Sequence, residues 1–225
     1  MNLQKIQQSI ADFKTYLSSS KSEDQLYKWE SLFHFQQNWD LEAPEFLEAY
    51  DKSLHNSVTK RLWKADQYVP KKMMSLFIKM DADYVKHTFQ DLFREAYNVG
   101  DRIDRFRFYC DELLATYKTE YPLSIENNHY HDYFIISLYL SFRYPEQYAL
   151  YEFASFQKGL QKLGVANLPA TDDIERYFKV CRTIWKFMEK DEEVWAVHQK
   201  RLRGKNLYRE KSLLLVHEFF QVIGN

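Results

Sequence analysis

Two stretches of this sequence interleave basic and aromatic side chains, a pattern that can hold phosphate groups and stack on nucleic-acid bases. In the first, six cations and one acid, Glu210, give a net charge of +5 between residues 200 and 211. Its residues are Lys200, Arg201, Arg203, Lys205, Tyr208, Arg209 and Lys211. The second stretch surrounds Trp63 and Tyr68 with Lys60, Arg61, Lys64, Lys71 and Lys72.

We expect the first stretch, together with Lys60, Arg61 and Lys64 of the second, to form a nucleic-acid-binding surface. The alternative is a solvated, mobile loop, because runs of charge are usually no more than that. The two basic stretches support DNA binding if they lie on one face of the molecule, and they argue against it if they are scattered.

A different chemistry is suggested by the sequence His129-Tyr130-His131-Asp132. Two histidines and a carboxylate are ligands that suit zinc or iron. Their i, i+2 spacing needs further ligands from elsewhere in the chain, and the sequence nominates none. Because the cluster stands in a loop just before an expected helix, we interpret its members as turn and capping residues and expect no metal site.

Motifs that would indicate catalysis are absent from the sequence. A phosphate-binding loop needs a glycine-rich pattern that ends in Lys-Ser or Lys-Thr, whereas Gly159–Gly164 reads GLQKLG. A nucleophile elbow, a dinucleotide fingerprint and an HExxH helix are missing as well. We therefore expect a protein without catalytic residues and without a cofactor, which neither binds nor hydrolyses ATP or GTP.

The composition limits the partners and the compartment. With 31 basic and 32 acidic residues the net charge is -1, so any contact with nucleic acid must be local. No window approaches the roughly 18 apolar residues of a membrane span, and the N-terminus lacks a signal-peptide pattern. Cys110 and Cys181 fall in apolar helical patterns, which indicates buried thiols in a reducing compartment. We expect a cytoplasmic protein with no membrane contact.

Glycine and proline are scarce, with five of each in 225 residues, which favours long helices over turn-rich β structure. Apolar residues recur every three or four positions along most of the chain, and the strongest such stripe lies between Ile174 and Met188 and includes Trp185. We expect a mainly α fold, a multi-helix globular bundle with at most one short β element near 147–153. We divide it into an N-terminal helix at 1–20 and a helical recognition or accessory domain at 21–225, which would subdivide near 121–128.

Capping signals predict several boundaries. Ser22 resembles an N-cap, Pro44 and Pro70 suit first helical positions, and Asn98–Gly100 resembles a helix C-terminus. The aromatic block Asn127–Gly164 is the expected core. Within it, the periodicity of Phe134–Phe142 does not separate buried helix from buried strand, and we favour helix.

Three aromatic-rich segments carry a resemblance to a known family. They are YKWESLFHFQQNWDLEAPEFLEAY (Tyr27–Tyr50), NHYHDYFIISLYLSFRYPEQYALYEFASFQKGLQKLG and ERYFKVCRTIWKFMEKDEEV. The most recognisable positions are Trp29 with Phe35–Trp39, Tyr139-Leu140 before Arg143-Tyr144-Pro145, and Tyr148–Phe156. Over Tyr27–Val194 the chain resembles the N-terminal region ahead of the ATPase module in McrB-type AAA+ proteins, the motor subunits of modification-dependent, type IV restriction systems.

The resemblance implies substrate recognition, typically of DNA, or a docking role. The chain departs from the family in having no Walker motif within its 225 residues. Our first hypothesis is a non-catalytic recognition module of a bacterial restriction or phage-defence AAA+ system that contacts DNA and works with the AAA+ motor or nuclease subunit of that system. The alternative is a helical protein-interaction or docking module with no DNA contact.

Overall fold

The computed structural model describes residues 1–55, 62–63 and 70–224, and these residues form helices and connections without a strand. The mainly α prediction is thereby confirmed. The elements are α1 (Leu3–Leu17), the 3-10 helix η1 (Ser20–Gln25), α2 (Leu26–Asn38), α3 (Phe46–Ser53), α4 (Pro70–Met80), α5 (Ala82–Leu92), α6 (Val99–Glu120), α7 (Tyr133–Arg143), α8 (Phe153–Lys162), α9 (Ile174–Met188), α10 (Glu192–Arg201) and α11 (Leu214–Ile223).

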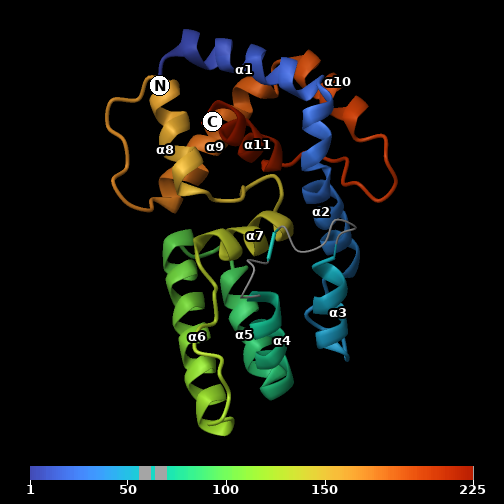
Figure 1. Ribbon diagram of the computed structural model, residues 1–225, viewed down its shortest axis with the longest axis vertical. Helices are drawn as coiled ribbons and strands as arrows, with labels where there is room; N and C mark the ends of the chain where they lie inside the picture. The colour runs from blue at the N-terminus through green and yellow to red at the C-terminus, as the bar shows by residue number, and fades with distance from the viewer. Residues whose placement is uncertain (56–61, 64–69, 225) are drawn as a thin grey trace.

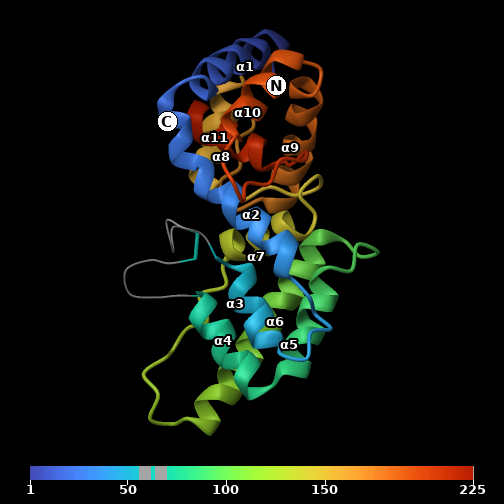
Figure 2. The same ribbon diagram turned by 90° about the vertical axis from the view of Figure 1, so that its right-hand side faces the viewer.

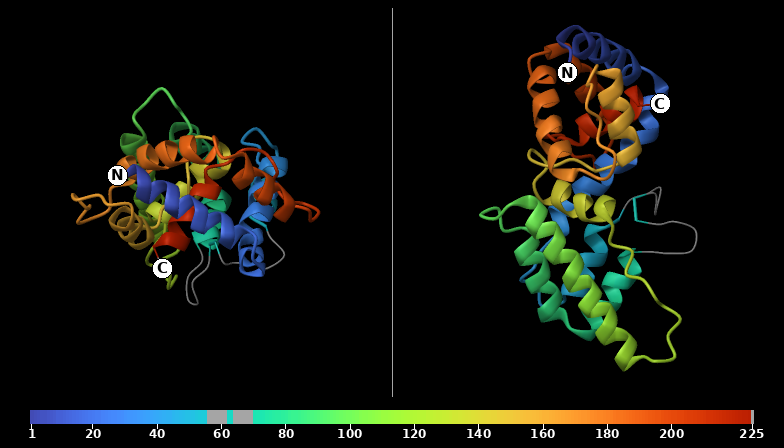
Figure 3. Two further views of the ribbon diagram at one scale, coloured as in Figure 1. Left: turned by 90° about the horizontal axis from the view of Figure 1, so that it is seen from above. Right: turned by 90° about the vertical axis from the view of Figure 1, so that its left-hand side faces the viewer.

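Two groups of helices stack along the long axis of the molecule (Figure 1). One group contains α1 and α8 to α11, the other contains α3 to α6, and α7 lies between them. Side views show the same division (Figure 2 and the right panel of Figure 3), and α2 leads from the first group down into α3. The N-terminal helix α1 packs against α10 and α11, so it belongs to the first group.

Helix α7 is the centre of the structure. Every residue from Ile135 to Phe142 is buried, as expected for a helix in which the larger side chains are apolar or aromatic and only two small serines interrupt them. Asp132 caps its N-terminus by accepting a hydrogen bond from the Ile135 amide at 3.0 Å. The prediction of a helix at Phe134–Phe142 is confirmed.

The segment at 147–153 contains no strand: Gln147 belongs to a turn, residues 148–152 form a connection, and Phe153 begins α8. Side chains rather than another strand satisfy its backbone groups. The Tyr151 amide donates to Ser137 Oγ at 2.8 Å. The Leu150 carbonyl accepts from Tyr177 Oη and lies 2.9 Å from His217 Nδ1. With these groups already bonded, the chain needs no strand partner here.

Two of the expected helix boundaries are wrong. Ser22 does not cap α2, because it lies in η1, where its Oγ donates to the carbonyls of Leu17 and Ser19, each at 2.9 Å. Asn98 does not end a helix but begins one: its side chain accepts from the Gly100 amide at 2.7 Å and caps α6.

The two prolines differ in their outcome. Pro70 is the first residue of α4, as predicted from its missing amide hydrogen. Helix α3 begins at Phe46, two positions beyond Pro44, so Pro44 belongs to the preceding turn.

The burial of Trp185 also departs from expectation. The buried stripe of α9 includes Ile184 and Met188, whereas Trp185 lies at the edge of that stripe and is only partly buried.

A buried cluster around one ion pair joins α2 to two helices of the first group, α10 and α11. The Trp29 indole on α2 donates to Glu218 Oε1 on α11 at 2.7 Å. Arg201 Nη1, at the end of α10, lies 2.8 Å from Glu218 Oε2, and the two side chains are 3% and 1% exposed. Arg201 also donates to the Ser22 carbonyl at 3.1 Å, so η1 is tied to the same cluster.

A second buried polar contact lies beside the first. Lys28 Nζ on α2 is 3.1 Å from His217 Nε2 on α11. Because the ammonium can only donate, His217 accepts at Nε2 and donates through Nδ1 to the Leu150 carbonyl. Burial lowers the pKa of Lys28 to about 8.

Replacement of Arg201 by alanine should destabilise the fold strongly. The change leaves the Glu218 carboxylate buried without its cation, which costs about 3 to 5 kcal/mol of unfolding free energy. Lys200→Ala, at the exposed neighbouring position, is the matched control and should stay within about 0.5 kcal/mol of the wild type. Urea denaturation followed by circular dichroism measures both, and equal midpoints for the two variants would contradict the role of the pair.

Mild acid should destabilise the fold through its buried histidines. Burial holds the pKa of His198 and of His217 well below the usual 6.5, so both are neutral in the folded chain. Below pH ~6.5 the unfolded chain binds more protons, and the unfolding free energy falls by up to about 1.4 kcal/mol per pH unit for each histidine. Urea denaturation midpoints measured at pH 7.5 and pH 5.5 test this pH dependence. His217→Gln should reduce the difference between the two midpoints. An unchanged midpoint at pH 5.5 would contradict it.

Candidate functional site

The basic stretch at 200–211 forms the end of α10 and most of the connection to α11 (Figure 1). Its ends are held by the core. Leu202 and Leu213 are each 1% exposed, and the Leu213 amide donates to the Pro145 carbonyl at 2.7 Å. In the middle, the Tyr208 amide donates to the Trp29 carbonyl at 3.1 Å. The connection is therefore attached to the rest of the fold at three points.

The cations of this stretch fall into two classes. Four are exposed and form no ion pair with any described residue: Lys200, Arg203, Lys205 and Arg209. Arg201 is buried against Glu218, and Lys211 Nζ lies 2.5 Å from Glu189 Oε1. The predicted phosphate-binding set thus reduces to the four exposed side chains.

Tyr208, the expected stacking residue, is only partly exposed. Burial raises the pKa of its phenol, with Glu210 adding to the effect. Because the core covers part of the ring and the main chain is bonded to α2, only part of the ring is open to a base.

The second basic stretch is described in part. Lys60, Arg61 and Lys64 lie outside the described residues. Lys71 Nζ is 2.8 Å from Asp51 Oδ1, and Lys72 pairs with Glu126. Both lysines belong to α4, in the other helix group, so the described cations of the two stretches do not form one surface (Figure 1).

A small apolar cleft lies beside the first stretch. It has a volume of about 170 Å³ and is lined by Trp185, Met188, Glu189, Glu192, Val194, Trp195, Lys211 and Leu215. The indoles of Trp185 and Trp195 meet edge to face, with ring centroids 6.4 Å apart. This cleft was not predicted from the sequence, because the apolar stripe of α9 indicated that Trp185 is part of the core.

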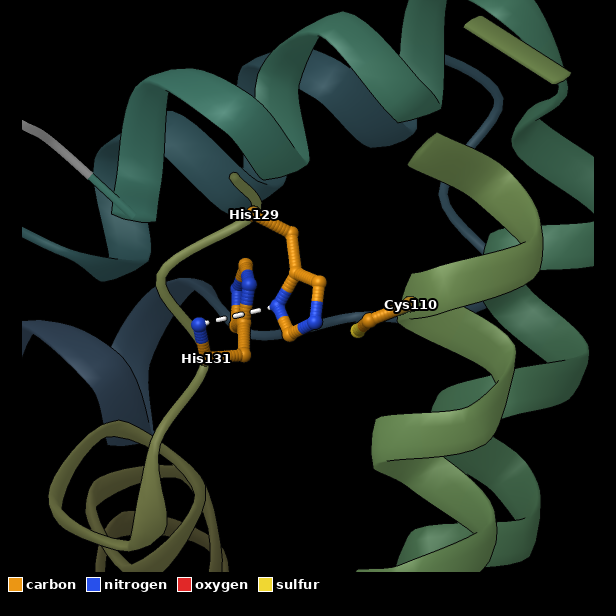
Figure 4. A group of neighbouring side chains, drawn as sticks. All are labelled: Cys110, His129 and His131. Atoms are coloured by element: carbon orange, nitrogen blue, oxygen red, sulfur yellow. Dashed lines mark hydrogen bonds between the residues drawn. The ribbon is translucent and has the colours of Figure 1, made fainter. Parts of the chain in front are cut away.

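The histidine cluster gains a neighbour that the sequence did not indicate. Cys110 of α6 points toward the His129 ring, and His131 lies on the other side of that ring (Figure 4). One ligand atom from each of the three residues lies within 4.8 Å of the others. Asp132 caps α7, as interpreted. His129 and His131, in contrast, also lie close to the Cys110 thiol.

Hydrogen bonds orient both imidazoles. His129 Nδ1 accepts from the His131 amide at 3.0 Å, and its Nε2 lies 3.2 Å from Asp111 Oδ1. His131 Nε2 is 3.3 Å from Tyr139 Oη. Burial lowers the pKa of His131 to about 3, so this ring is neutral at physiological pH.

An open cavity of about 510 Å³ adjoins the two histidines. Its walls are Arg107, Asp111 and Leu114 of α6 and the segment Asn127–Asp132. The cavity connects the partly exposed His129 ring with solvent. Solutes can therefore reach the cluster from one side.

Comparisons with protein-family models, curated proteins and solved structures found no match for this chain. Among the residues that the structure describes, no helix is long and apolar enough to cross a membrane. The functional conclusion therefore depends on the geometry of the sites.

Proposed function

We propose that this chain is a non-catalytic recognition module that binds DNA through the connection between α10 and α11. The observation that carries the proposal is the set of four exposed cations with no carboxylate partner among the described residues: Lys200, Arg203, Lys205 and Arg209. Cations of this kind can exchange solution counterions for phosphates, which is the main source of affinity in non-specific DNA binding.

The fold supports the proposal by fixing the backbone that carries these cations. Arg201 lies between Lys200 and Arg203 in sequence, but its guanidinium is bonded inside the core. Tyr208 ties the middle of the connection to α2 through its amide. A backbone held in this way loses less conformational entropy when it binds than a free loop does. The role of Arg201 is then to position the site and not to contact phosphate.

The resemblance to the region ahead of McrB-type motors gives the proposal a context. In that context the chain recognises substrate for a bacterial restriction or phage-defence AAA+ system in the cytoplasm, and its protein partner is the motor or nuclease subunit. The sequence carries no phosphate-binding loop, which is consistent with binding that is not coupled to hydrolysis in this chain.

DNA binding by this surface should depend steeply on salt. If all four cations contact phosphates, log K falls with log salt at a slope of about -3.6, a loss of about 150-fold between 50 and 200 mM. Combining Lys200→Ala, Arg203→Ala and Lys205→Ala should reduce the magnitude of the slope by about 2.7 and weaken binding to all DNA sequences alike. Fluorescence anisotropy with a labelled duplex measures both quantities.

The matched control removes three exposed lysines elsewhere, by combining Lys79→Ala, Lys118→Ala and Lys179→Ala. This variant has the same net charge as the first triple variant and should keep the wild-type slope. Absence of binding at 50 mM salt, or an equal loss in both triple variants, would contradict the proposal.

Two observations favour the docking alternative. The described cations of the two basic stretches lie on different helix groups, so they do not form the single face expected of a DNA-binding surface. Leu123 and Ile125, in the connection between α6 and α7, are 96% and 92% exposed. Contiguous exposed apolar surface marks protein contact sites, and in this alternative the two side chains lie at its centre. In this alternative Leu123→Ser combined with Ile125→Ser abolishes copurification with the AAA+ motor of the same system, and the triple lysine and arginine variant leaves it intact.

A further inference from the structure

We propose that Cys110, His129 and His131 bind one zinc ion where α6 meets the segment Asn127–Asp132. The site is independent of the DNA-binding surface, because it lies on the other helix group. Three features support the site: the convergence of the ligand atoms, an unpartnered buried nitrogen and the surrounding hydrogen bonds.

The ligand atoms converge from two elements that are distant in the sequence. Cys110 comes from the middle of α6, and the histidines come from the connection that follows this helix (Figure 4). Their ligand atoms lie within 4.8 Å of one another. With the bond lengths of tetrahedral zinc, ligand atoms are about 3.3 to 3.6 Å apart, so the widest pair closes by no more than about 1.5 Å. Rotation of the partly exposed His129 side chain can supply a shift of this size.

His131 carries the observation that points to a ligand. The residue is 2% exposed, and its Nδ1 atom is buried without a hydrogen-bond partner. A buried nitrogen in this state is costly, because it has lost its contact with water and gained nothing in return. A metal ion would occupy the lone pair of this atom.

The other nitrogen of each ring already has the kind of partner that metal-bound histidines have. His131 Nε2 lies near Tyr139 Oη, which is 2.9 Å from Tyr50 Oη. His129 Nδ1 accepts from the His131 amide, so Nε2 donates to Asp111; a metal bound at Nδ1 would replace the amide and leave Asp111 as the outer partner of the ring. Metal-ligating histidines usually have such an outer hydrogen bond, and it fixes the orientation of the ring.

The donor set selects the metal. One thiolate and two imidazoles suit zinc, with a tetrahedral fourth position left for water from the adjoining cavity. On binding, the Cys110 thiol releases its proton to solvent as the sulfur-zinc bond forms. The metal would then cross-link α6 to the connection that also carries the exposed Leu123 and Ile125.

Titration of the purified chain with Zn²⁺, and with Co²⁺ as a spectroscopic probe, tests the site. We expect one ion per chain and, with Co²⁺, the thiolate charge-transfer and d–d absorption of a tetrahedral cysteine-histidine site. Cys110→Ala should remove the charge-transfer band and weaken binding by more than about 100-fold, the upper end of the loss seen when only an outer partner is removed. Cys181→Ala, at the other buried cysteine, is the control and should change neither the charge-transfer band nor the affinity for the metal.

A second variant, at a histidine, tests the site even if the substitution of buried Cys110 disturbs folding. His129 is at the cavity wall, so His129→Gln should fold and still lose the site. His34→Gln is its control, because His34 and His55 form another histidine pair with ring centroids 5.3 Å apart. Circular dichroism confirms that each variant is folded. Lack of saturable binding at micromolar zinc, or binding that survives both Cys110→Ala and His129→Gln, would overturn the proposal.

Discussion

The buried carboxylate of Glu218 is the constraint on which the first helix group depends. A buried charge must be paired and hydrogen-bonded, and the Glu218 carboxylate accepts a hydrogen bond from the Trp29 indole and pairs with the Arg201 guanidinium. Because the three residues belong to α11, α2 and α10, the carboxylate keeps both partners only when these three helices pack together. The same interaction fixes the end of α10, which carries Lys200, and the start of the connection, which carries Arg203, so the buried ion pair and the candidate DNA surface share Arg201.

Much of the fold could be predicted from local signals. The apolar stripe of α9 and the first-position Pro70 follow from periodicity and from backbone chemistry, whereas periodicity alone left α7 open between helix and strand. Asn98 was misread because Asn and Gly are common at both ends of helices, and only the spatial course of α6 shows which end is present. Trp185 was misread because a stripe with a spacing of three or four residues does not show how wide the buried face is.

The sites were less predictable, because they depend on contacts between distant residues. The sequence shows a run of cations, but not that Arg201 pairs with a glutamate on the following helix. Likewise the spacing of His129 and His131 led to an interpretation without a metal, since nothing local indicates Cys110. Tertiary packing alone brings that thiol to the two imidazoles. In both cases one buried partner changes the chemistry of a recognisable sequence pattern.

Nuclear magnetic resonance on the isotope-labelled chain during addition of duplex DNA tests the central claim most directly. The account predicts amide shift changes concentrated at 200–209, with the resonance of Tyr208 among them, and little change in α4 to α6. Shift changes confined to the segment around Leu123 and Ile125, or no changes at low salt, would contradict it. Shift changes confined to the segment around Leu123 and Ile125 would place the functional surface on the other helix group.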